Sequence, residues 1–147
     1  MSWDNSLNTG KGRRFQDQAA ELLGHHFGVN FRKNAEIPIG KPPKTHKFDL
    51  ATSDLHYVGE CKNYSWTEGK NVPSAKMGFV NEAVFYLTFL SPETVRFVAM
   101  RRDIHPATHE NLAEYYYRTY HHLLGNVFII EVDIESGEIK EIGRALG

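Results

Sequence analysis

The stretch FDLATSDLHYVGECK (Phe48–Lys62) decides how this sequence is interpreted, because it places charge inside two otherwise apolar, strand-like runs. Residues 47–51 and 56–62 have the composition of strands, and the polar residues 52–55 between them predict a hairpin. A charged side chain inside an apolar strand requires a partner or a function. Three such side chains stand out: Asp49, Glu60 and Lys62.

Strand geometry predicts that these side chains converge. Residues two apart in a strand share a face, so Glu60 and Lys62 point one way, and Gly59 and Cys61 point the other way. If the connection contains an even number of residues, odd-numbered positions of the first strand pair with even-numbered positions of the second. Asp49 then lies on the face of Glu60, and the three charged residues form one polar edge.

A pair of carboxylates at this edge predicts a metal site. Two carboxylates a few ångströms apart repel each other unless a cation lies between them, and hard oxygen ligands suit Mg²⁺ or Mn²⁺. Such an ion can activate one of its waters, while Lys62 could orient that water or stabilise charge on a phosphate oxygen. An exposed cross-strand ion pair is the alternative explanation of the same residues.

Spacing alone does not select Glu60, because Glu-x-Lys occurs three times in the chain. The copy at 68–70 lies in a polar, glycine-containing loop with no strand to hold it. The copy at 138–140 alternates with isoleucines, as a solvated strand face does. Context therefore favours residues 60–62.

Apolar periodicity predicts the remaining elements of the chain. After a polar stretch over 1–9, expected to be a flexible leader, they are a helix over 15–27, a strand over 29–39, a helix over 73–90, a strand over 95–100, a helix over 109–124 and a strand over 127–134 with a short return. Paired strands followed by strand-helix-strand connections imply a mixed sheet with helices on its faces. We expect a single α/β domain over residues 1–147.

Composition bounds the class of protein. The chain has 147 residues, of which 41% are hydrophobic, and this is enough for one domain with a real core. Its single cysteine, Cys61, cannot form an internal disulfide, which excludes a disulfide scaffold. The longest apolar run, residues 83–90, is too short to span a bilayer, and residues 1–9 lack an apolar signal core. We expect a soluble, cytoplasmic protein without a membrane partner.

The formal charge of −1 conceals an uneven distribution along the chain. Residues 11–47 contain eight Lys or Arg against three Asp or Glu, whereas residues 131–147 contain two against five. The basic stretch leads into Asp49, where a phosphate backbone would approach. The candidate nucleic-acid contacts are Arg13, Arg14, Lys44 and Lys47, together with Lys76 near the positive end of the second helix.

The motif Phe48-Asp49-Leu50 … Val58-Gly59-Glu60-Cys61-Lys62, preceded by a helix and a strand and followed by a helix and a strand, resembles the PD-(D/E)xK nuclease superfamily. The resemblance covers residues 10–100. It implies a restriction-endonuclease-like core of order αβββαβ, here with an added C-terminal helix and strands. It also implies a metal-dependent nuclease acting on DNA, with Asp49 and Glu60 as metal ligands and Lys62 as the catalytic lysine. Cutting both strands would suit a homodimer.

Two positions depart from the family pattern. Phe48 stands where the family often has proline, and Gln16 stands where many members place a metal-binding glutamate on the first helix. An amide oxygen can ligate a cation or hold its water but brings no charge, so we expect Gln16 to complete the site. The other candidate, Glu21, points toward solvent. The departure also leaves open a catalytically lapsed fold that serves as a nucleic-acid-binding or protein-interaction module.

Overall fold

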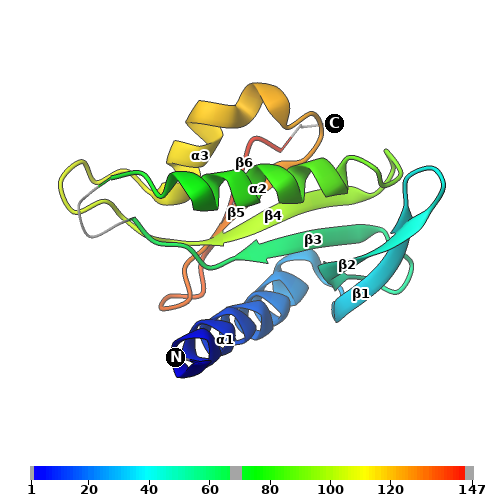
Figure 1. Cartoon of the computed structure of the whole chain (residues 1–147), viewed down its shortest axis with the longest axis horizontal. Helices are drawn as coiled ribbons and strands as arrows, with labels where there is room; N and C mark the ends of the chain where they lie inside the picture. Colours follow the sequence, from blue (N-terminus) through cyan, green and yellow to red (C-terminus); the bar gives the residue numbers. More distant parts are fainter. Residues whose placement is uncertain (1, 67–70, 145–147) are drawn as a thin grey trace.

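The computed structural model describes residues 2–66 and 71–144 and confirms a mixed α/β architecture. The elements in chain order are α1 (Ser2–Phe27), β1 (Arg32–Ile39), β2 (Lys44–Ala51), β3 (Tyr57–Lys62), α2 (Ser74–Leu87), β4 (Val95–Arg101), α3 (Leu112–Tyr120), a 3₁₀ turn (His121–Leu123), β5 (Phe128–Val132) and β6 (Ile139–Ile142) (Figure 1). The first helix begins at Ser2, so it includes residues 2–9, which were expected to precede it as a leader.

The six strands found in the described part of the chain form one sheet in which spatial order follows chain order, from β1 to β6. The pairs β1–β2, β2–β3 and β5–β6 are antiparallel, whereas β3–β4 and β4–β5 are parallel. The two parallel connections contain α2 and α3, because a parallel crossover needs a helix to return the chain across the sheet. The predicted mixed sheet is confirmed.

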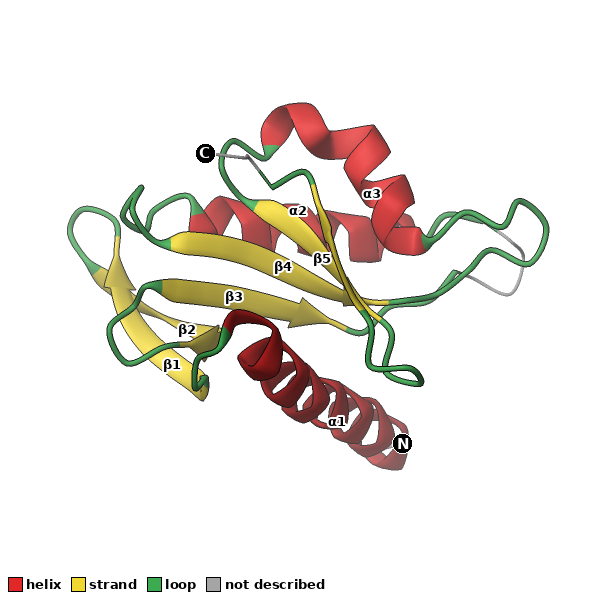
Figure 2. Ribbon diagram, turned by 180° about the vertical axis from the view of Figure 1, so that it is seen from behind, coloured by secondary structure: helices red, strands yellow, loops and turns green. Residues whose placement is uncertain are grey.

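The helices cover both faces of the sheet (Figures 1 and 2). On one face, α1 buries Phe15, Ala19 and Leu23, which recur every four residues as the sequence predicted. On the other face, α2 buries residues such as Met77 and Val80, and α3 contributes to the same apolar cluster. The sheet is thus the middle layer between two cores.

Several predicted boundaries are wrong, and two of the errors have clear causes. The second strand begins at Lys44 instead of residue 47, because pairing with β1 continues up to Ile39↔Lys44. The third helix begins at Leu112 instead of residue 109, because His109 has a left-handed φ of 61° and cannot start a helix. Before it, the His105 ring accepts hydrogen bonds from the main-chain N–H groups of 107 and 108.

None of the helices in the described ranges combines the length and the hydropathy that a bilayer crossing requires.

Candidate active site

The site lies where β2 and β3 separate. These strands pair only at Leu50↔Gly59 and Ala51↔Val58, so odd-numbered residues oppose even-numbered ones, as predicted. The next position in this register places Asp49 opposite Glu60. There the ladder stops, and Asp49 Oδ2 accepts a hydrogen bond of 2.8 Å from the Cys61 N–H. A carboxylate therefore takes the place of a strand carbonyl at the fork.

The β1–β2 ladder is also interrupted at Asp49. Its register omits the opposite residue, Asn34, which has a φ of 57°. Gln16 of α1 fills this gap, because its Nε2 donates to the Asp49 carbonyl oxygen (2.9 Å) and to Asn34 Oδ1 (3.1 Å). The amide of Gln16 thus holds the main chain of Asp49 from behind.

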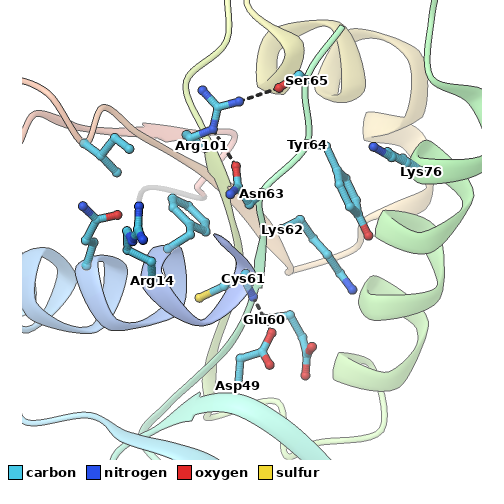
Figure 3. Close-up of a pocket in the computed structure, with 14 residues that line it drawn as sticks. Arg14, Asp49, Glu60, Cys61, Lys62, Asn63, Tyr64, Ser65, Lys76 and Arg101 are labelled. Atoms are coloured by element: carbon cyan, nitrogen blue, oxygen red, sulfur yellow. Dashed lines mark hydrogen bonds between the residues drawn. The ribbon is translucent and has the colours of Figure 1, made fainter. Parts of the chain in front are cut away.

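This interruption changes the direction of the side chains along β2. In a regular strand, residues two apart share a face, yet Phe48 packs in the cluster under α2 and Leu50 packs in the cluster under α1. The change of face occurs at Asp49. Its carboxylate is consequently directed at the fork and lies beside that of Glu60 (Figure 3).

Glu60 is buried, with 6% of its surface exposed, and its Oε1 has no hydrogen-bond partner. Burial, followed by repulsion from Asp49, raises the pKa of Glu60 to about 9, although Lys62 opposes this shift. A buried carboxyl with an unsatisfied oxygen is costly unless it gains a proton or a cation. This environment fits a divalent cation as the missing partner.

The two carboxylates suit a hard cation such as Mg²⁺ or Mn²⁺ better than zinc or copper, which favour imidazole and thiolate ligands. No three His, Cys, Asp or Glu side chains within residues 2–66 and 71–144 are grouped to hold a metal ion. Mg²⁺ is commonly held by one or two carboxylates and keeps several waters, so Asp49 and Glu60 are sufficient for it. The residues of the fork therefore fit the cation that the resemblance implies.

His46 is a basic group beside Glu60. Its Nε2 lies 3.8 Å from Glu60 Oε1, and its ring stacks on Tyr86 of α2 with centroids 3.9 Å apart and planes at 11°. Burial lowers the pKa of His46, against the opposing effect of Asp49. His46 thus borders the carboxylate pair and connects it to the face of α2.

A cavity of about 810 Å³ opens in front of the carboxylates. Among the described residues, four cationic side chains line it: Arg14, Lys62, Lys76 and Arg101. Lys62 and Tyr64 extend from β3 and the segment after it toward α2, where Lys76 lies (Figure 3). Lys76 Nζ is 5.5 Å from the Tyr64 ring centroid, and burial raises the pKa of Tyr64. A cavity with two carboxylates and four cations suits a phosphate ester together with a metal ion.

Arg101, at the end of β4, fixes the segment that follows β3. Its Nε donates to Asn63 Oδ1 and its Nη2 donates to Ser65 Oγ, both at 2.5 Å (Figure 3). The next residues are tied by Asp103, which accepts from the Trp66 main-chain N–H at 2.8 Å. These contacts fix the segment after β3, whose residues 63–65 line the cavity.

The predicted site residues fall into three groups. Asp49, Glu60 and Lys62 meet at the fork, and Arg14 and Lys76 line the same cavity. Gln16 contacts the back of Asp49 and is not on the cavity wall. The remaining basic candidates lie elsewhere: Arg13 and Lys47 are exposed away from the cavity, and Lys44 lines a separate groove.

The other two Glu-x-Lys copies are separated from this site. Residues 68–70 lie outside the described residues. Glu138 and Lys140 are exposed at the edge strand β6, and Lys140 forms an ion pair of 2.5 Å with Glu114. Glu21 is exposed, as expected, and lines a different hollow beside α1.

Sequence reasoning missed His46, Tyr64 and Arg101 as neighbours of the site. His46 precedes Asp49 by three residues but was placed outside the predicted strand. Arg101 is the first charged residue after the apolar run 97–100 of a central strand, and such an interruption is a usable signal. Tyr64 has no distinguishing pattern in the sequence.

Comparison with protein-family models, with curated proteins and with solved structures finds no match for this chain. Its function is therefore inferred from the geometry of the site.

Proposed function

We propose that this protein is a metal-dependent nuclease that hydrolyses DNA phosphodiester bonds, with Asp49 and Glu60 binding Mg²⁺ or Mn²⁺ and Lys62 acting on the phosphate. The observation that carries the proposal is the buried Glu60 carboxyl beside Asp49, with one oxygen unsatisfied and a pKa of about 9. In a cavity lined by cationic side chains, this pair can exchange a proton for a cation and lies where a phosphate would be attracted.

The chain itself orients the groups that the reaction needs. The Cys61 N–H and the Gln16 amide fix Asp49 through its carboxylate and its carbonyl, respectively. Lys62 and Lys76 reach the cavity from β3 and α2 and can bind the non-bridging oxygens of a phosphate. A bound divalent cation would supply an activated water and neutralise charge on the phosphate.

The architecture supports the same proposal. The order α1-β1-β2-β3-α2-β4 agrees with the αβββαβ order of the PD-(D/E)xK superfamily, and the motif residues lie on β2 and β3. We infer that the chain has a restriction-endonuclease-like core, to which α3, β5 and β6 are added.

Plasmid cleavage tests the proposal. We expect supercoiled DNA to be nicked or linearised with Mg²⁺ and to remain intact with EDTA. Asp49→Asn, Glu60→Gln and Lys62→Ala should each reduce the rate by about 100-fold or more, as loss of a general catalytic or electrostatic group does. Lys140→Ala, the lysine of the exposed Glu-x-Lys copy, is the matched control and should cleave as wild type does. Cleavage that survives both Asp49→Asn and Lys62→Ala would show that the site is elsewhere.

A catalytically lapsed fold that binds nucleic acid or another protein is the second candidate. One observation favours it: the position that carries an acid in many family members is Gln16, and its amide is engaged with the main chain. DNA binding by the wild type, measured by fluorescence anisotropy, without cleavage in Mg²⁺ or Mn²⁺ would favour this candidate.

A further inference from the structure

A groove of about 330 Å³ lies between α2 and the end of the β1–β2 hairpin, outside the cavity described above. Phe85 and Phe89 form one wall and are unusually exposed for phenylalanine, at 61% and 48%. Their rings meet edge to face with centroids 5.1 Å apart. The opposite wall includes Lys44 and His46 of β2. Exposed aromatic side chains that line a hollow indicate a binding surface.

The imidazole ring of His46 borders both the groove and the candidate active site. His46 lines the groove, stacks on Tyr86 and lies 3.8 Å from Glu60 Oε1. A DNA strand with a phosphate at the carboxylate pair therefore has the groove directly beside it. This continuity favours an occupant that reaches the carboxylates at the same time.

We propose that the groove binds an unpaired base of the DNA strand by stacking on Phe85 and Phe89, with Lys44 contacting an adjacent phosphate. This inference rests on the proposed nuclease function and specifies its substrate as DNA with unpaired bases next to the cleaved bond. Every base has an aromatic face that can stack on a phenylalanine ring, whereas the bases of a regular duplex are stacked on one another.

Size and charge agree with this occupant. A volume of about 330 Å³ is at the lower end of the range for small-molecule sites, which suits one planar group. Lys44 provides a positive charge on the hairpin side of the groove, and the exposed Lys41 lies in the turn of the same hairpin. The strand backbone would follow this basic side, with its base directed toward α2.

Equilibrium binding tests the inference without relying on cleavage. The wild type is titrated by fluorescence anisotropy, in EDTA, with a 12-nucleotide oligo-dT and with a 12-nucleotide abasic strand of equal charge. We expect the base-bearing strand to bind about 5- to 150-fold more tightly, the range for stacking of one base. Phe85→Leu with Phe89→Leu, which keeps an apolar surface but removes both rings, should abolish this difference and leave the affinity for the abasic strand unchanged.

Phe79→Ala is the matched control, because Phe79 is also exposed on α2 (51%) but does not line the groove. It should keep the difference between the two strands. Equal binding of both strands by the wild type, or an unchanged difference in the double leucine variant, would overturn the inference. A double variant that dissociates a dimer in sedimentation velocity and keeps the difference would instead identify the groove as an interface between copies, which also overturns it.

The binding experiment and the plasmid cleavage assay can fail independently of each other. If the base-dependent difference depends on the two phenylalanines but no condition supports cleavage, the groove stands and the nuclease proposal fails. If the protein cleaves plasmid DNA but does not distinguish the two strands, the nuclease proposal stands and the groove inference fails.

Discussion

At the scale of single residues, the surroundings of Glu60 conflict with the ordinary chemistry of a carboxyl group. A carboxyl with a usual pKa of 4.5 is held at about 9 by burial and by Asp49. The folded protein therefore favours the protonated form, and the contribution of Glu60 to stability is fully present below pH 4.5 and is lost as the pH rises toward 9. A divalent cation would displace that proton and reverse the loss.

This linkage predicts how stability depends on pH and on metal. We expect Mg²⁺ to raise the Tm of the wild type more at pH 8.5 than at pH 6, because the metal-free protein is less stable at the higher pH. Glu60→Gln removes the charge, so it should raise the metal-free Tm at pH 8.5 by roughly 3 °C, for about 1 kcal/mol, and abolish the response to Mg²⁺. Differential scanning fluorimetry measures both effects. Glu138→Gln, an exposed control, should behave as wild type; an unchanged Mg²⁺ response in Glu60→Gln would contradict the assignment.

Gln16 leads to a second prediction at this scale, because its amide donates two hydrogen bonds that a carboxylate cannot donate. Gln16→Glu, although it restores the acid of the family pattern, should lower the free energy of unfolding by about 1–3 kcal/mol and reduce cleavage. Denaturant unfolding and the plasmid assay measure these effects. Gln18→Glu, which adds the same charge on the same helix, should be close to neutral for stability. Faster cleavage by Gln16→Glu would show that position 16 faces the cation.

At the scale of elements, the predicted and observed structures agree where the hydrophobic periodicity of a single segment determines its structure. The stripe Phe15, Ala19 and Leu23 identified α1 because a helix packed on a sheet buries a single face. The parity of the β2–β3 hairpin could be predicted because an even number of residues, 52–55, was expected to connect the two strands. The start of β2 was missed because Pro42 and Pro43 end a strand locally, whereas pairing with β1 extends β2 back to Lys44. Long-range pairing of this kind has no local signal.

The same limit applies to the candidate site. Asp49, Glu60 and Lys62 could be predicted because they lie on neighbouring strands of one hairpin. The contact of Gln16 with Asp49, in contrast, depends on the left-handed backbone of Asn34, which opens the β1–β2 ladder. His46 joins the site only because α2 provides Tyr86 for it to stack on. Both contacts depend on how separate elements pack.

Gly59 provides a prediction for the packing between β3 and β4. A Cβ at this position would overlap the ring of Phe97, its partner on the parallel strand. We expect Gly59→Ala to lower the free energy of unfolding by about 1–3 kcal/mol, measured by urea denaturation, and Phe97→Leu in the same chain to recover part of the loss. Gly78→Ala is the contrast, since open space surrounds that helical position and alanine should stabilise it by up to about 1 kcal/mol. Equal effects at the two glycines would contradict the predicted overlap.

At the scale of the whole molecule, the near-neutral charge is compatible with DNA binding because the cations are grouped. Arg14, Lys62, Lys76 and Arg101 surround the cavity, and Lys44 extends this positive side along the hairpin. In contrast, Lys140 on β6 is neutralised by Glu114. The molecule therefore presents a positive side at the fork and a neutralised edge at β6.

Salt dependence of DNA affinity tests this distribution. The logarithm of the binding constant should fall linearly with the logarithm of salt concentration, with a slope set by the number of phosphates contacted. Lys44→Ala and Lys76→Ala should each weaken binding of any sequence and reduce the slope by about 1. Lys140→Ala should leave the slope unchanged. A slope that none of the three variants alters would show that the phosphates lie on another surface.

The order of the strands has a consequence for how the chain is made. Because β1 to β6 are neighbours in the order in which they are synthesised, each strand from β2 onward finds a partner strand already made. The first helix is the exception: its stripe packs in one cluster with Phe97 and Phe128, which are translated much later. The apolar face of α1 is thus covered only after β4 and β5 have been made, and until then it is open to chaperones.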